Sequence, residues 1–212
     1  MRTDDLIRAI SADAARRSPP LAAAWWAAAA LAVAVAAVAF FVLLGPRADF
    51  ALAVETPRFL FKFLVTGLLA ASAFVLLRLL ARPGAPASRA APFLALAPLL
   101  LAAAVVIEFV VIPPADYAAR LVGSNLALCL TFIPLIGIAP LAVFLGVLRY
   151  GAPTRPVFAG AVAGIAAGGL AATFYAAHCT DDSPLFVATW YSLAIASLAC
   201  VGALAAPRLA RW

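Results

Sequence analysis

The chain has 212 residues, of which 67% are hydrophobic and only 11% are charged. A soluble domain carries about 25% charged residues, so this composition excludes nearly every soluble enzyme fold and indicates an integral membrane protein. The net charge of +6 is explained by basic residues placed around a membrane and attracted to anionic lipid, and it requires no direct nucleic-acid partner.

The polar segment of the first 20 residues reads MRTDDLIRAISADAARRSPP and is typical of a short amphipathic helix. Two acidic residues near its start favour the positive end of the helix dipole, and an apolar stripe follows them. These residues are Asp4, Asp5, Leu6, Ile7 and Ile10. An isolated helix of about 14 residues is marginal in water, so the stripe should be buried. It could lie on the membrane surface or the cytoplasmic end of the protein, or it could bind a groove of a cytoplasmic protein.

Long apolar runs occupy the rest of the chain. A helix needs about 20 apolar residues to cross a bilayer, and a backbone in hydrocarbon must satisfy its own hydrogen bonds, so each run should be a helix. The expected spans are 22–44, 59–81, 92–112, 122–148, 157–177 and 185–206. The sequence therefore predicts an all-α, polytopic membrane protein, with a cytoplasmic amphipathic segment at 1–20 and a six-helix transmembrane domain at 21–212.

The basic residues predict the orientation. Eleven arginines fall with the termini, the 82–91 loop and the 149–156 loop, whereas only Arg47, Arg58, Lys62 and Arg120 fall on the other side. Basic residues in short loops are retained in the cytoplasm, so both termini should be cytoplasmic.

Two charged residues lie near the outer ends of the apolar runs. Lys62 is near the outer end of the second span and Glu108 is near the outer end of the third. A charge inside a bilayer is costly unless it is paired or functional, so we expect a Lys62–Glu108 ion pair, with a proton path as the alternative. On the fifth span, Gly160, Gly164 and Gly168 form a small-residue face that allows close helix packing, within one bundle or between subunits.

Three residues suggest a sensor at the outer face. Cys129 lies in the fourth span, and Cys179 follows the single histidine, His178, after the fifth. Two thiols near an oxidising compartment can form a disulfide or bind a soft metal ion, but a free cysteine also packs as a small hydrophobe. If the fourth span begins near residue 121, Cys129 lies about 12 Å along the helix. The 178–184 loop would then have to fold inward to reach it.

No catalytic signature is apparent. The sequence has no Gly-rich phosphate loop after a strand, no nucleophile elbow and no HExxH motif, and the histidine has no orienting partner. We expect no enzyme activity, no resident metal and no cofactor.

The opening TDDLIRAISAD, the six spans and the segment YAAHCTDDSPLFVATWY at 175–191 together resemble the NrsF family of membrane-bound negative regulators of sigma factors. The resemblance implies an anti-sigma factor of the bacterial inner membrane. Such a protein would hold an extracytoplasmic-function sigma factor through its N-terminal segment and release it on an envelope, metal or redox signal. The resemblance implies that Asp4, Asp5, Leu6 and Ile7 contact the sigma factor. It also implies that Cys129 and Cys179 match the positions at which the family has a cysteine in the fourth span and one in the loop after the fifth span.

Two other functions compete with this one. A small transporter or channel is suggested by the prolines at 98, 134 and 140, the glycine face and Glu108, but the spans have few polar residues to line a path and no evident internal repeat. An assembly or scaffold subunit of a membrane complex is the third possibility.

Overall fold

The computed structural model describes residues 3–14 and 21–209, without the side chains of residues 9, 10 and 12–14. The chain forms, in order, α1 (Thr3–Ala14), α2 (Leu21–Leu43), α3 (Phe50–Ala53), α4 (Pro57–Leu80), α5 (Ala87–Leu94), α6 (Leu96–Val111), a 3₁₀ turn (Pro114–Asp116), α7 (Tyr117–Val122), α8 (Leu126–Leu148), α9 (Pro156–Ala176), α10 (Pro184–Phe186), a π-helical segment (Val187–Tyr191) and α11 (Ser192–Leu209). Over these residues there is no strand, and six helices are long and apolar enough to cross a membrane. The all-α, polytopic prediction is confirmed.

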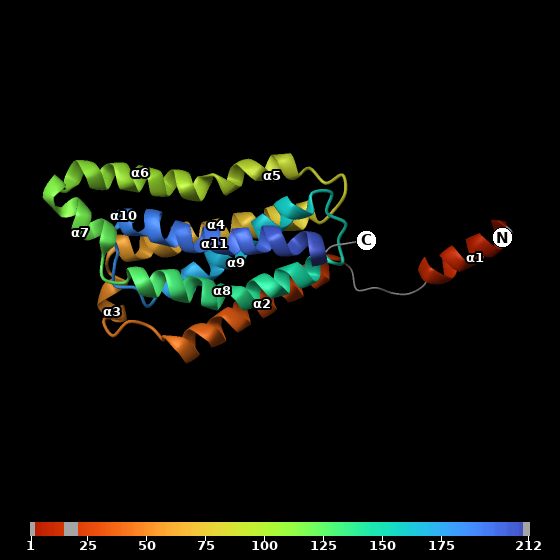
Figure 1. The fold of residues 1–212 in the computed structure, drawn as a ribbon, viewed down its shortest axis with the longest axis horizontal. Helices are drawn as coiled ribbons and strands as arrows, with labels where there is room; N and C mark the ends of the chain where they lie inside the picture. The colour runs from red at the N-terminus through yellow and green to blue at the C-terminus, as the bar shows by residue number, and fades with distance from the viewer. Residues whose placement is uncertain (1–2, 15–20, 210–212) are drawn as a thin grey trace.

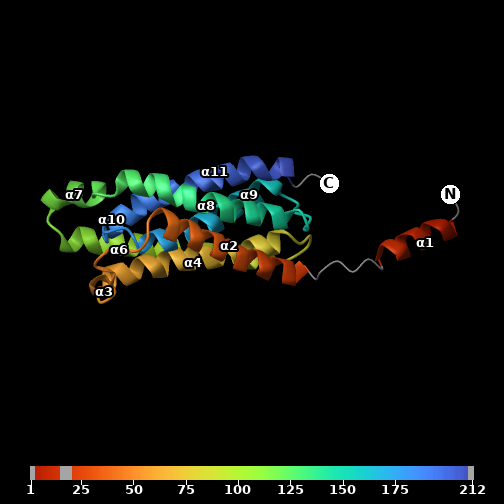
Figure 2. The same cartoon turned by 90° about the horizontal axis from the view of Figure 1, so that it is seen from below.

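The six long helices run lengthwise in one bundle, as Figures 1 and 2 show. Helix α9 lies at its centre, in contact with α4, α8 and α11, and is the most buried of the spans. Its buried positions are mostly alanine and glycine. Small side chains let the neighbouring backbones approach closely, which compensates for the weak hydrophobic driving force between helices in lipid.

The glycine face of α9 packs against α11. A Cβ atom added at Gly164 would lie 2.5 Å from the Cα atom of Ala199, and one at Gly160 would meet the backbone of Gly202. Only glycine permits this distance between the two backbones. The face therefore serves the interior of the bundle.

The fourth span is shorter than expected. It begins at Leu126 instead of residue 122, because residues 117–122 form the separate helix α7. Gly123 ends that helix with a φ of +58°, and a Cβ atom there would meet the ring of Phe186 at 2.6 Å. The left-handed backbone and the crowding both require glycine.

Helix α1 lies beyond the end of the bundle at which the chain's last helix ends (Figure 1). Leu6 and Ile7 are 43% and 58% exposed, and Asp4 and Asp5 are exposed beside them. The side chain of Ile10, the remaining residue of the expected stripe, lies outside the described residues.

Candidate functional site

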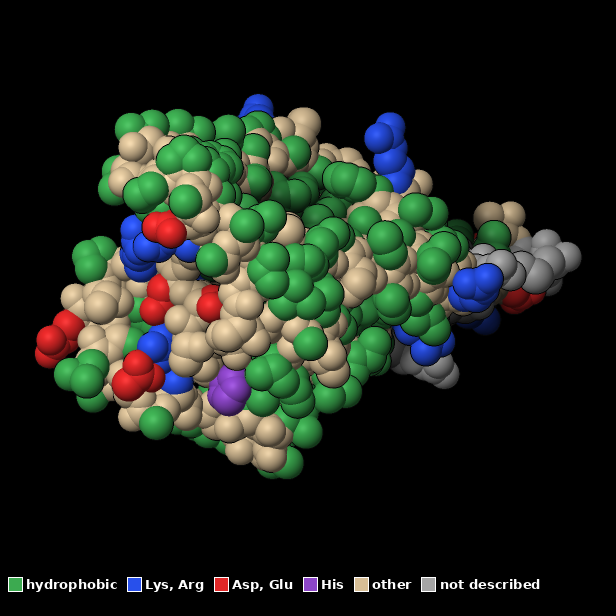
Figure 3. Space-filling model, turned by 60° about the vertical axis from the view of Figure 1, so that its left-hand side comes forward, with side chains coloured by type: hydrophobic (Ala, Val, Ile, Leu, Met, Phe, Trp, Pro, Cys, Tyr) green, Lys and Arg blue, Asp and Glu red, His purple; other side chains and the backbone are tan. Residues whose placement is uncertain are grey.

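Charged side chains gather at the end of the bundle opposite α1. Figure 3 shows Lys, Arg, Asp, Glu and the single histidine close together on that end, with apolar side chains over much of the rest of the visible face. At the centre of this region is the 178–183 loop, which connects α9 to α10. We call the charged residues around it the polar cluster: Arg47, Lys62, Glu108, Arg120, Asp181 and Asp182.

Lys62 projects from the second span into this loop. Its Nζ atom lies 2.5 Å from Oδ1 of Asp182 and donates a hydrogen bond of 2.8 Å to the carbonyl oxygen of Cys179. The side chain is only 1% exposed, so this ion pair and hydrogen bond offset the cost of removing its charge from water. The expected Lys62–Glu108 pair does not form, because the loop supplies a closer carboxylate.

Arg47, in the connection between α2 and α3, binds the other side of the same carboxylate. Its Nη1 atom lies 3.1 Å from Oδ2 of Asp182, and its backbone N–H donates to the carbonyl oxygen of Ala177 at 3.0 Å. Two further hydrogen bonds of 2.6 Å join its guanidinium to Asp49. These bonds raise the pKa of Arg47 and lower the pKa of Asp49, because each ion stabilises the charged form of the other.

Glu108, on α6, caps the start of another helix, α10. Its carboxylate accepts hydrogen bonds from Oγ of Ser183, at 2.9 and 3.0 Å, and from the backbone N–H of Leu185 at 2.9 Å. Arg120 lies 3.5 Å away as its counterion. The start of α10 has no side-chain cap of its own, so a charge that hydropathy marks as costly satisfies the orphan donors of this helix.

Asp181 plays the same part for α8. Its carboxylate accepts from the backbone N–H groups of Ser124 and Asn125, at 3.0 and 2.8 Å, and from Nδ2 of Asn125 at 2.9 Å. A negative charge at the positive end of a helix is favourable. The 178–183 loop therefore fixes the start of α8 and is itself held by α4, α6 and the α2–α3 connection.

Of the two cysteines of the expected sensor, Cys179 belongs to this loop and Cys129 lies in α8. Cys129 and Cys179 are free thiols with no exposed surface, and both belong to the apolar cluster that contains Tyr175 and Tyr191. Cys129 lies in the first turn of α8, about 4.5 Å from its start at 1.5 Å per residue, and the loop folds inward above it. Burial raises the pKa of the Cys179 thiol, which disfavours the reactive thiolate.

His178, the third sensor candidate, is directed to a different part of the structure. Its Nδ1 atom lies 2.9 Å from the carbonyl oxygen of Gly45, just after α2. Among the described residues no three His, Cys, Asp or Glu side chains are grouped so as to hold a metal ion. The structure thus places the two thiols in one buried cluster and uses the imidazole to tie the loop to α2.

Sequence reasoning missed Asp182 and Arg120, the partners of the two buried charges. It also missed the contacts of Arg47 and Asp181. The sequence did contain one signal for these partners. An acidic pair follows the fifth span directly, and the second and third spans each carry a charged residue that needs a partner. Which acid would meet which cation depends on contacts separated by as many as 135 residues.

Fold and site together define a polytopic helical membrane protein whose buried charges hold its loops in place at one end of the bundle, with a short exposed helix beyond the other. The NrsF family, described as "Negative regulator of sigma F", matches residues 10–212, and the chain belongs to this family. It is a regulatory family, and the chain is a membrane protein that negatively regulates a sigma factor.

Two relatives match over 100% of both chains. The "Anti-sigma-F factor NrsF" of Caulobacter vibrioides (strain NA1000 / CB15N) is 36% identical over 214 residues. The "Probable anti-sigma-F factor NrsF" of Azospira oryzae (strain ATCC BAA-33 / DSM 13638 / PS) is 34% identical over 214 residues. No solved structure matches the chain.

Proposed function

We propose that this protein holds an extracytoplasmic-function sigma factor at the bacterial inner membrane through helix α1 and releases it on an envelope, metal or redox signal. The observation that carries the proposal is that α1 stands outside a bundle that is packed without it, with Leu6 and Ile7 exposed. An amphipathic helix that leaves its apolar face uncovered is suited to a groove on a partner. Asp4 and Asp5 would select a basic rim around that groove, and Ile10 would complete the stripe.

The distribution of basic residues supports a cytoplasmic position for α1. The ends of the spans on the α1 side carry Arg78, Arg82, Arg89, Arg149 and Arg155, and such residues are retained in the cytoplasm. The polar cluster would then face the periplasm. In this proposal, residues 1–20 hold the sigma factor at the cytoplasmic face, and residues 21–212 form the membrane domain that receives the signal at the other face.

Co-purification with a co-expressed extracytoplasmic-function sigma factor of the same organism tests the docking helix. We expect Leu6→Asp or Ile7→Asp to abolish capture, because each places a charge where the groove should be apolar. Arg8→Asp is the matched control: Arg8 is exposed on the opposite face of the same helix, so its variant should still capture the sigma factor. Capture that survives both Leu6→Asp and Ile7→Asp would show that α1 is not the docking element.

The signal is proposed to reach Cys129 and Cys179 when the 178–183 loop lifts. Both thiols are buried in the arrangement described, so an oxidant or a soft metal ion could react only with an opened form. Such a ligand shifts the equilibrium only by its difference in affinity between the closed and opened forms. His178 belongs to this loop, so its hydrogen bond to the carbonyl oxygen of Gly45 would break when the loop lifts.

Serine variants test this step. We expect Cys129→Ser and Cys179→Ser each to abolish sigma release by an oxidant or by a soft metal salt, while both retain basal capture. Cys200→Ser is the control, because Cys200 is an exposed free thiol on α11. A double Cys129→Ser, Cys179→Ser variant that responds as the wild type does would remove the thiols from the signalling step.

No observation favours a transport path. Lys62 binds Asp182 and Glu108 binds the Leu185 N–H, both at one end of the bundle. These contacts hold the backbone of the 178–183 loop and of the start of α10 in place.

A further inference from the structure

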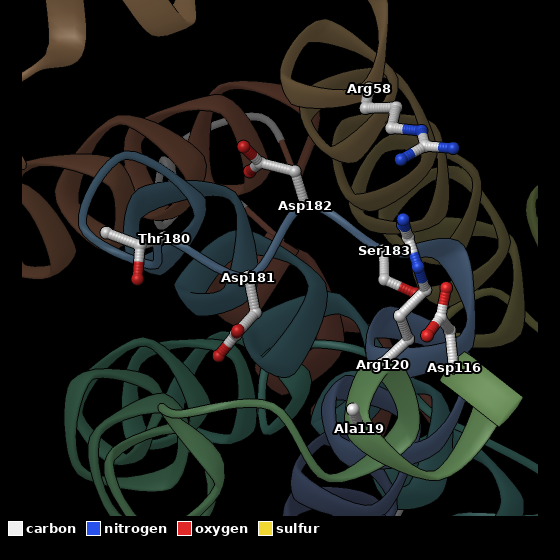
Figure 4. A pocket seen from close by; sticks show the side chains of 8 residues that line it. All are labelled: Arg58, Asp116, Ala119, Arg120, Thr180, Asp181, Asp182 and Ser183. Carbon is white, nitrogen blue, oxygen red and sulfur yellow. The ribbon is translucent and has the colours of Figure 1, made fainter.

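Two adjoining cavities at the polar-cluster end share one residue, Arg58 at the start of α4. The first has a volume of about 370 Å³ and a polar lining that includes Asp116, Arg120 and Asp181 (Figure 4). The second has a volume of about 310 Å³, lies between α4 and α6 and is lined mainly by apolar side chains, Phe61, Ala104, Ile107 and Val111 among them. A polar chamber that continues into an apolar one fits an amphiphile.

The polar cavity offers partners for both a negative and a positive charge. Within the described part of the chain, the side chains of Arg58 and Asp116 make no hydrogen bond or ion pair, and both residues are exposed. Arg120 is 35% exposed and meets Glu108 only at 3.5 Å. In Figure 4 the guanidinium groups of Arg58 and Arg120 lie along one wall of the cavity, and Asp116 lies beyond Arg120. Two guanidinium groups on one wall favour a phosphate, which arginine binds through two hydrogen bonds at once.

The apolar cavity lies on the most lipid-accessible seam of the bundle. Helix α6 buries only Ala97, Leu101 and Glu108, and its Ile107 and Val111 are largely exposed. Exposed side chains on a membrane span face acyl chains. A chain lying between α4 and α6 would enter the second cavity while its headgroup remained at the level of Arg58.

We propose that these two cavities bind one phospholipid with an amine headgroup, phosphatidylethanolamine. Its phosphate lies between Arg58 and Arg120, its ammonium group faces Asp116, and one acyl chain fills the space between α4 and α6. The mixed charge of the polar cavity decides the headgroup, because a headgroup without an ammonium group would leave the carboxylate of Asp116 without a cation. The inference goes beyond the proposed sigma sequestration and does not depend on it.

Native mass spectrometry tests the site on the full-length protein, released from nanodiscs that contain equal amounts of phosphatidylethanolamine and phosphatidylglycerol. We expect one retained phosphatidylethanolamine on the wild type and about tenfold less retention on Arg58→Ala, the effect of losing one charge-assisted contact. Arg89→Ala is the matched control, since Arg89 is exposed at the other end of the bundle, and it should retain the lipid. Equal retention by Arg58→Ala and wild type, or a preference for phosphatidylglycerol, would overturn the assignment.

A second variant examines the acyl chain without touching any charge. Ala104→Phe fills the apolar cavity, so this variant should also lose the retained lipid. In a separate measurement on the wild type, inorganic phosphate should fail to displace that lipid. Displacement by phosphate would mean that the cavity binds a free anion. A dimer that forms on delipidation and is abolished by Ala104→Phe would mean that the groove is an interface between copies. Either result would reject the lipid site.

Discussion

Replacing Glu108 by alanine should strongly destabilise the protein. The variant removes the acceptor of the Leu185 N–H and of the Ser183 hydroxyl, at 2.9 Å each, in a position where Glu108 is only 3% exposed. It also leaves Arg120 without its counterion. Breaking a buried charged network by removing one member costs about 3–5 kcal/mol.

Unfolding in mixed micelles with increasing sodium dodecyl sulfate, followed by circular dichroism, measures this difference. Glu108→Gln keeps a carbonyl oxygen for the Leu185 N–H, so it should lose only about 1–2 kcal/mol. Glu55→Ala removes an exposed carboxylate from the α3–α4 connection, and it should stay within about 0.5 kcal/mol of the wild type.

The order of the three variants is what the capping role requires. If Glu108→Ala and Glu55→Ala unfold at the same detergent fraction, Glu108 does not hold the start of α10. If Glu108→Gln is as unstable as Glu108→Ala, charge and not the hydrogen-bond acceptor is what the position supplies.

Three further changes probe the other supports of the fold. Asp181→Ala should cost about 1–2 kcal/mol in the same titration, since it removes the carboxylate that caps the start of α8. The amide protons at the start of α8 should then exchange faster with solvent. Gly164→Val should cost at least about 1–3 kcal/mol by overpacking against the α11 backbone, whereas Gly146→Val, at a glycine with open space around it, should not. The Arg47–Asp49 pair stabilises the fold above the ordinary pKa of an aspartate, about 3.9, and this contribution is lost as the pH falls through the lowered pKa of Asp49. Between about pH 5 and pH 2 the wild type should therefore lose more stability than Asp49→Asn, a result that equal acid-unfolding curves would contradict.

Hydropathy was sufficient to predict the six spans because each depends only on its own residues. It placed the start of the fourth span four residues early, since the run was continued across Gly123, Ser124 and Asn125 to the apolar residues before them. The positive φ of that glycine and the two polar residues after it separate α7 from α8. The consequence was large for the thiols, because the corrected start moves Cys129 into the first helical turn, near the level of the 178–183 loop.

The pairing of the buried charges could not be predicted in the same way. Lys62 and Glu108 are close in depth, so an ion pair between them was a reasonable expectation. The structure instead gives Lys62 to Asp182 and Glu108 to Ser183 and Leu185. Depth in the membrane does not specify angular position in a bundle, and a loop that folds inward brings acceptors that no span carries.

The two ends of the bundle should respond very differently to changes in the length of their connections. The 178–183 loop joins α9 to α10 while its backbone and side chains are bonded to α4, α6, the α2–α3 connection and the residue before α8, so adding one residue there would displace several contacts together. By contrast, residues 82–86 make only local backbone hydrogen bonds, and Gly84 has open space around it. A tag or a fluorescent label can be inserted at residues 82–86 with little disturbance. An insertion at residues 178–183 would break the contacts that hold that loop.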